Sequence, residues 1–88
     1  MATSIVQLIA NNPTRLVGLK QVVRGISEGI VWCVIVASDS DEFVLQRIRD
    51  AIGDRKVSVK TIDSKSKLGA LAGIEVAASV VGLVVTAR

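Results

Sequence analysis

One stretch of this chain begins a predicted helix with basic side chains where a helix favours acidic ones. The stretch is "VGLKQVVRG" (residues 17–25), and it carries no carboxylate before Glu28. After Gly18 it presents a row of polar and basic residues: Lys20, Gln21 and Arg24. Because the N-terminal end of a helix carries partial positive charge, cations are disfavoured there unless an anion binds. Nucleic-acid phosphates would supply that charge, and Gln21 could read a base edge. The alternative is an amphipathic helix with a solvated basic face.

A second predicted helix start is also basic. In "SKSKLGALAG" (residues 64–73), Lys65 and Lys67 fall in the first turn. The N–H groups of a helix start point outward, and lysines beside them add charge for a phosphate. A solvated basic patch remains the alternative at this site. Two such starts in one small chain favour a polyanionic partner.

Two other stretches could take part in chemistry. Asp39 and Asp41 follow a predicted buried strand, where carboxylates can hold magnesium or accept a phosphoryl group. We favour helix capping instead, with Asp39 as the cap and Glu42 three residues on. In "GIEVAA" (residues 73–78), apolar and acidic residues alternate. That segment is either the early start of a strand or an apolar loop that packs on unstacked bases.

Catalysis has few candidate residues in this sequence. The chain has no histidine, so Cys33, the single cysteine, has no imidazole base beside it. Cys33 lies inside the apolar run "VWCVIVA", which indicates a buried, reduced thiol. We therefore predict no catalytic residue, no metal site and no cofactor.

The length and composition of the chain indicate the number of domains and the class of protein. The chain has 88 residues, half of them hydrophobic, and a formal net charge of +3. This length suits one small domain over residues 1–88. The longest apolar stretch, residues 76–87, is shorter than the roughly 20 residues that span a bilayer. We expect a cytoplasmic monomer without a membrane anchor.

Helices and strands are predicted to alternate along the chain. Apolar residues recur at helical spacing in three segments, 3–11, 18–28 and 41–52. A fourth, short helix is predicted over 64–72, with Ser64 as its cap and Gly73 at its end. Strands are predicted between and after these helices, at 15–18, 30–37, 56–62 and 79–86. Gly29, Gly53 and Gly73 follow helices, with Gly53 expected in the left-handed conformation. Alternating elements predict an α/β sandwich with helices on both faces of a small sheet.

Three blocks of this sequence together resemble the kink-turn RNA-binding ribosomal proteins of the L7Ae/L30e type. "GLKQVVRGI" is similar to their G-x-[K/N]-[Q/E]-x-x-[K/R] motif, and "VIVASDSDE" to their central strand and acidic cap. "SKSKLGALAGIEVAASVV" resembles their S-K-x-x-L-G-x-A-x-G-I-x-V segment. The blocks stand in the right order over residues 16–86. The Lys-Gln pair and the short chain look most like the bacterial branch.

The resemblance implies a three-layer α-β-α sandwich with a mixed four-stranded sheet. It also implies an RNA partner, a helix sharply bent at a three-nucleotide bulge and flanked by sheared G·A pairs. The residues that it places against this RNA are Gly18, Leu19, Lys20, Gln21, Arg24, Lys65, Lys67, Ile74, Glu75, Val76 and Ala77.

The roles implied for these residues differ along the chain. Lys20 and Gln21 would contact the G·A base edges, and Gly18 would let the backbone approach closely. Arg24 would pair with bases or phosphate, the two lysines of residues 64–73 would contact phosphate, and residues 74–77 would cover the bulge.

Two positions depart from the family's pattern. Leu19 stands where many members have threonine, and Lys20-Gln21 replaces the Asn-Glu pair of archaeal members. Glutamine offers one acceptor and two donors, whereas glutamate only accepts, so these departures bear on which bases are preferred.

We therefore hypothesise a non-catalytic, ribosome-associated RNA-binding protein that recognises and stabilises kink-turns. The alternative is a protein-interaction module on the same fold, using the apolar segment around Ile74 and Val76.

Overall fold

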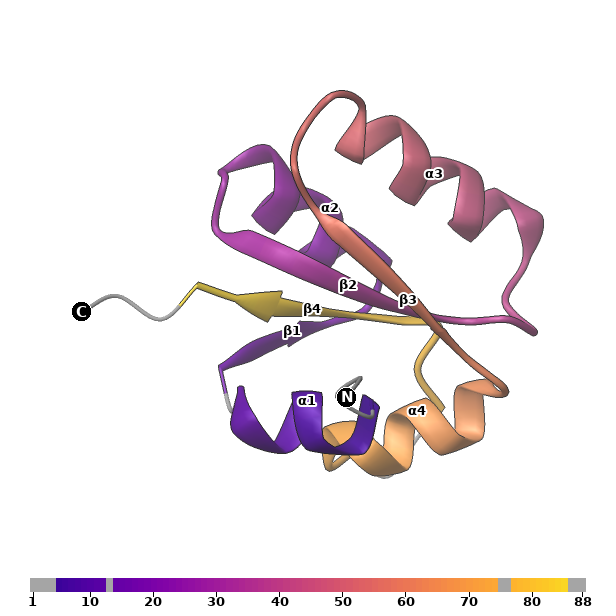
Figure 1. The fold of residues 1–88 in the computed structure, drawn as a ribbon. Helices are drawn as coiled ribbons and strands as arrows, with labels where there is room; N and C mark the ends of the chain where they lie inside the picture. Colours follow the sequence, from indigo (N-terminus) through magenta and orange to yellow (C-terminus); the bar gives the residue numbers. More distant parts are fainter. Residues whose placement is uncertain (1–4, 13, 75–76, 86–88) are drawn as a thin grey trace.

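Four helices and four strands alternate in the part of the chain that the computed structural model describes, namely residues 5–12, 14–74 and 77–85 (Figure 1). In chain order they are α1 (Ile5–Asn11), β1 (Arg15–Val17), α2 (Leu19–Ser27), β2 (Val31–Ala37), α3 (Glu42–Ile52), β3 (Ser58–Ile62), α4 (Lys65–Ala72) and β4 (Val80–Val84). The predicted order of elements is confirmed. None of the described helices has the length and apolar character needed to cross a bilayer.

The strands form one mixed sheet in the order β1-β4-β2-β3. Strand β4 is antiparallel to both β1 and β2, and β3 is parallel to β2. Helices α1 and α4 cover one face, and α2 and α3 cover the other (Figure 1). The predicted three-layer sandwich with a mixed four-stranded sheet is therefore confirmed.

This topology brings three helix starts to the same end of the sheet. Strands β1, β2 and β3 all run against β4, so their carboxyl ends lie together. Each of them is followed directly by a helix, respectively α2, α3 and α4. We call this region the carboxyl end of the sheet. It is where sheets of this kind place their binding loops.

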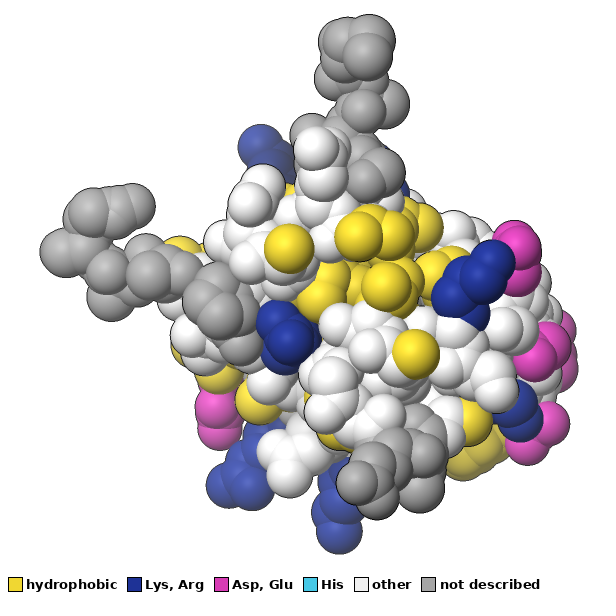
Figure 2. Space-filling model, turned by 90° about the horizontal axis from the view of Figure 1, so that it is seen from below, with side chains coloured by type: hydrophobic (Ala, Val, Ile, Leu, Met, Phe, Trp, Pro, Cys, Tyr) yellow, Lys and Arg dark blue, Asp and Glu magenta, His cyan; other side chains and the backbone are white. Residues whose placement is uncertain are grey.

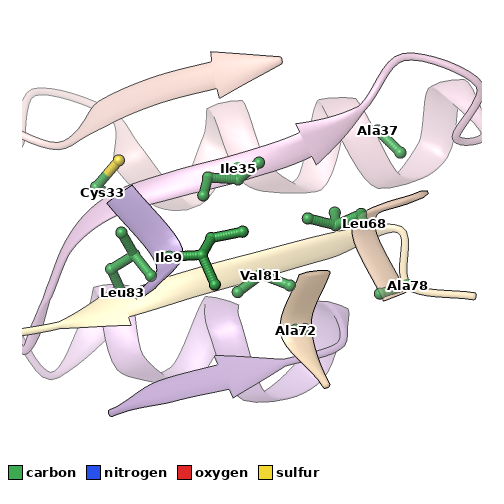
Figure 3. Close-up of a cluster of buried hydrophobic side chains, with 9 residues drawn as sticks. All are labelled: Ile9, Cys33, Ile35, Ala37, Leu68, Ala72, Ala78, Val81 and Leu83. Atoms are coloured by element: carbon green, nitrogen blue, oxygen red, sulfur yellow. The ribbon is translucent and has the colours of Figure 1, made fainter. Parts of the chain in front are cut away.

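Aliphatic side chains fill both interlayer spaces. On one face, Ile9 from α1 and Leu68 from α4 pack onto β2 and β4, as Figure 3 shows. On the other face, Val22 and Ile26 of α2 and Ile48 of α3 form the second core cluster with side chains of β2 and β4. Strand β2 is buried on both faces, as its continuous apolar run predicted.

The cap predicted for α3 belongs to a different helix. The residue that caps α3 is Asp41, and its side chain makes no capping hydrogen bond. Instead, Asp39 Oδ1 accepts a 2.9 Å bond from the backbone N–H of Lys65, the first residue of α4. Because β2 and β3 are parallel neighbours, the turn after β2 lies beside the start of the helix after β3. Glu42 pairs with Arg49 at 3.6 Å and does not complete a capping box.

The helix ends follow the predicted glycines with one difference. Gly73 is left-handed at φ 81°, ψ 24°, which is the expected helix end. Gly53 ends α3 with a positive φ of 50°, but its ψ of −121° lies outside the left-handed helical region, contrary to the prediction.

Arg15 joins the ends of two helices on one face of the sheet. Its guanidinium donates to the carbonyl oxygens of Ile9 and Asn12 at the end of α1, both at 3.2 Å. It also donates to the carbonyl of Ala72, the last residue of α4, at 3.3 Å. A cation is favourable at the negative end of a helix, so Arg15 is explained by the fold alone.

Candidate nucleic-acid interface

The start of α2 is set by a backbone conformation that requires glycine. Gly18 has φ 100° and ψ 152°, a region that residues with a side chain rarely adopt. Its N–H donates to the carbonyl of Val80 at 3.0 Å, and its own carbonyl accepts from Val22 at 3.0 Å. A Cβ added at Gly18 would meet no atom within 4 Å, so this backbone faces open space.

The first turn of α2 is free of the groups that normally neutralise a helix start. It contains no acidic residue, and the residue at its cap position, Gly18, has no side chain that could accept a hydrogen bond from it. Its outward N–H groups and partial positive charge are therefore directed to whatever lies in front of the helix.

Helical spacing divides the predicted contact residues of α2 between core and surface. Leu19 is half-buried and packs against the second core cluster with Val22 and Ile26. Lys20 and Gln21 are exposed on the other side of the helix. The leucine that replaces the family's threonine therefore contributes to packing.

Arg24 is also exposed, and it forms an ion pair with Glu28 one helical turn further along. Its Nε lies 3.5 Å from Glu28 Oε2, and the two side chains are 78% and 54% exposed. Exposed pairs of this kind contribute little to stability, commonly less than about 1 kcal/mol. Arg24 can therefore exchange Glu28 for another anion at low cost.

A depression of about 590 Å³ runs along the exposed side of α2. Its lining residues are Lys20, Gln21, Val23, Arg24, Ser27 and Arg47. Three of them are cations and none carries a carboxylate. Arg47 comes from α3, which packs beside α2 on the same face of the sheet. We call this depression the α2–α3 groove.

Sequence reasoning missed Arg47 because nothing in the sequence fixes which flank of α3 adjoins α2. The apolar stripe of α3 shows which side faces the sheet, and Arg47 directly precedes the buried Ile48. Which of the two flanks of that stripe meets α2 depends on the way the helices are arranged on the sheet.

The start of α4 differs from that of α2, although both are basic. Ser64 Oγ accepts a 3.1 Å hydrogen bond from the N–H of Lys67, and Asp39 accepts from the N–H of Lys65. Lys67 Nζ also lies 3.4 Å from Asp63 Oδ2 in an exposed pair. Two backbone donors of α4 are thus already used, so the charge that α4 offers a phosphate comes from its lysine side chains.

Backbone hydrogen bonds hold the two basic helix starts on either side of the start of β4. The N–H of Ala78 donates to the carbonyl of Lys65 at 3.0 Å, and Gly18 donates to Val80 two residues further along. The intervening Ser79 accepts from the N–H of Ala37 at 2.9 Å. The two stretches that the sequence singled out are therefore brought to the same end of the sheet.

The structure describes part of the segment that follows α4. Ile74 is half-buried against the first core cluster, and its N–H donates to the carbonyl of Gly69 at 3.1 Å. Ala77 is exposed, while Glu75 and Val76 lie outside the described residues. Figure 2 looks onto the side formed by α1 and α4, where hydrophobic side chains gather between Lys and Arg side chains.

The remaining candidates have structural roles in the described part of the chain. No group of three or more His, Cys, Asp or Glu residues there is arranged to hold a metal ion. Asp39 is engaged at the start of α4. Cys33 is fully buried, and burial raises the pKa of its thiol above the usual 9.0 while Lys60 opposes the shift. A protonated, inaccessible thiol is a poor nucleophile.

Comparison with known protein families gives a match over nearly the whole chain. Residues 3–88 match the model of the ribosomal protein L7Ae/L30e/S12e/Gadd45 family. An RNA-binding protein of Geobacillus sp. strain WCH70 is 38% identical over 69 residues, which is 78% of this chain and 84% of that protein. The RNA-binding protein YbxF of Geobacillus stearothermophilus is 35% identical over 68 residues, covering 77% and 83%.

Solved structures share the fold. A protein of unknown function from Bacillus halodurans superposes with a TM-score of 0.78 at 27% identity, covering 92% of this chain and 81% of that one. The Giardia lamblia 15.5kD RNA binding protein superposes with the same TM-score at 21% identity, covering 98% and 79%. The second likeness supports the three-layer architecture alone.

Proposed function

Because the chain belongs to the ribosomal protein L7Ae/L30e/S12e/Gadd45 family, we propose that it is a non-catalytic RNA-binding protein that recognises and stabilises kink-turns. Relatives at 38% and 35% identity bear the name RNA-binding protein. The observation that carries the proposal is the start of α2, which is basic and uncapped and opens on a glycine facing open space.

In this proposal the start of α2 enters the widened groove at the bend of the RNA. The free N–H groups of its first turn and the helix dipole attract phosphate or electronegative base edges. Gln21 is exposed, and its amide can donate to and accept from the edge of a base in a sheared G·A pair. Lys20 and Arg24 stand next to it and neutralise phosphates.

The start of α4 and the segment 74–77 form the second part of the proposed interface. Lys65 and Lys67 contribute side-chain charge, since their backbone N–H groups are taken up by capping. Ile74 is half-buried against the first core cluster, and Ala77 is exposed. Apolar side chains of this segment would cover bases that are unstacked at the bulge.

The mechanism is selection of the bent conformer. A flexible bulged helix samples bent and extended forms, and a protein that contacts only the bent form shifts the population toward it. This needs no covalent chemistry. Kink-turns in ribosomal RNA are the proposed cellular targets. The protein would then be cytoplasmic and associated with the ribosome.

Bend-sensitive fluorescence on a duplex that contains a kink-turn tests the proposal. We expect tight binding with bending, and much weaker binding to a control duplex whose G·A pairs are replaced by Watson–Crick pairs. Gln21→Ala should reduce the difference between the two RNAs, whereas Lys20→Gln should weaken binding to both. Equal affinity for the two duplexes would contradict the proposal and favour a protein-interaction module on this fold.

A further inference from the structure

Two arginines on α3 stand two residues apart and have opposite surroundings. Arg49 Nη1 lies 3.6 Å from Glu42 Oε2 and donates to Gln46 Oε1 at 3.4 Å. Arg47 is exposed and, within the described residues, has no ion-pair or hydrogen-bond partner. The neighbouring carboxylate of Asp50 accepts from Gln46 at 3.0 Å.

The unpaired arginine lies in the α2–α3 groove. Arg47 lines this groove opposite Lys20 and Arg24, whereas Arg49 lines a separate depression of about 250 Å³ against β2 and β3. With three cations and no carboxylate in its lining, the α2–α3 groove attracts anions. The other polar groups in it, Gln21 and Ser27, are neutral and can donate hydrogen bonds.

We propose that Arg47 binds the phosphate backbone of the RNA, so that the interface extends from the start of α2 into the α2–α3 groove. The inference rests on the proposed function and adds to it a residue on a third element. Gln21, the proposed contact with the G·A pairs, lies near the start of α2 and also lines the groove, which therefore begins at that contact. A strand that leaves those pairs along the exposed side of α2 passes Arg24 and Arg47.

The chemistry of the groove suits phosphate better than bases. A guanidinium presents paired N–H donors that match two oxygens of one phosphate, and it carries its charge at every physiological pH. The groove has no aromatic lining residue on which a base could stack. Contacts to phosphate carry no sequence information, so Arg47 should affect affinity and leave the choice of RNA unchanged.

Arg47→Gln and Arg49→Gln form a matched pair that tests the inference. Both remove one positive charge from the same helix, so any effect of net charge on RNA binding is common to them. Affinity for the kink-turn duplex is measured against salt concentration for both variants and the wild type. We expect Arg47→Gln to weaken binding about tenfold and to reduce the slope of log affinity against log salt by about one phosphate contact. Arg49→Gln should stay near the wild type.

The outcomes separate this inference from the proposed function. If both variants weaken binding equally and with the same slope, Arg47 makes no specific phosphate contact and the inference is wrong. That result leaves the function intact as long as the wild type still prefers the kink-turn over the duplex without G·A pairs. An Arg47→Gln loss that stays the same when the base pairs flanking the G·A pairs of the kink-turn duplex are exchanged supports a phosphate contact. A loss that changes with those bases would overturn it in favour of a base contact.

Discussion

At the scale of single residues, the fold changes the chemistry of Cys33 in a way that can be measured. The thiol is fully buried in β2, and loss of hydration raises its pKa above the usual 9.0, although Lys60 acts in the opposite direction. The folded protein therefore holds the proton to higher pH than the unfolded chain does.

This shift predicts a loss of stability in alkaline solution. Well below the ordinary thiol pKa both states keep the proton, and Cys33 adds no pH dependence. As the pH rises through that pKa the unfolded state loses its proton first, so the free energy of unfolding falls until the higher folded-state pKa is reached. Urea denaturation at several pH values on either side of pH 9.0 measures the fall. Cys33→Ala should show a shallower alkaline decline, because it removes the thiol whose pKa differs between the two states. An identical decline would show that the thiol does not contribute.

Residue-level prediction succeeded where periodicity decides the answer. Helical spacing from Leu19 to Ile26 correctly separated the buried side of α2 from Lys20, Gln21 and Arg24. It failed for Asp39, because a cap that joins the turn after β2 to α4 depends on β2 and β3 being parallel neighbours. Residues far apart in the chain leave no trace of such contacts in local sequence patterns.

At the scale of elements, a glycine lets α2 pack closely against the sheet. Gly25 lies in the middle of this helix and is buried. A Cβ at this position would come within 2.6 Å of Leu16 Cδ1 and 2.7 Å of Val31 Cγ2. Val31 is β-branched and stiff, so it cannot easily move aside.

Gly25→Ala is therefore expected to destabilise the protein although alanine is the better helix former. Alanine in place of glycine gains about 1 kcal/mol in an exposed helix, whereas overpacking costs about 1–3 kcal/mol. We expect a net loss of about 1 kcal/mol in the free energy of unfolding, measured by urea denaturation. Ser27→Ala in the same helix is the control. Ser27 is exposed, and its replacement should change stability by less than about 0.5 kcal/mol. If Gly25→Ala stabilises the protein, Leu16 and Val31 can move away from the added methyl group without an energetic cost.

The elements themselves were largely predictable, and their lateral arrangement was less so. Continuous apolar runs predicted β2, and glycines and Ser64 marked the ends of helices. Strand β3 has four exposed residues at the edge of the sheet and is shorter than predicted. Which flank of α3 faces α2 is set by packing between layers, and for this reason Arg47 was not among the predicted site residues.

At the scale of the whole molecule, the proposed interface spans elements from both faces of the sheet. The start of α2 lies on one side of β4 and the start of α4 on the other, and backbone bonds join each to residues 78–80. An RNA that contacts both starts would hold the two outer layers together through this segment. The opposite end of the sheet has its own bonds, from Val84 to Thr14 at 3.1 Å and from Val85 to Ile30 at 2.7 Å.

Hydrogen exchange can detect this difference between the two ends. On binding of a kink-turn RNA, we expect the amides of Gly18 and Ala78 to exchange more slowly than global stabilisation alone explains, because local opening there would break RNA contacts. The amides of Val84 and Val85 serve as internal controls and should slow only by the global amount. Equal slowing at both ends would mean that the RNA does not bridge the two helix starts. Slowing at Gly18 without slowing at Ala78 would confine the contact to the α2 side, and the lysines of α4 would then have no part in binding.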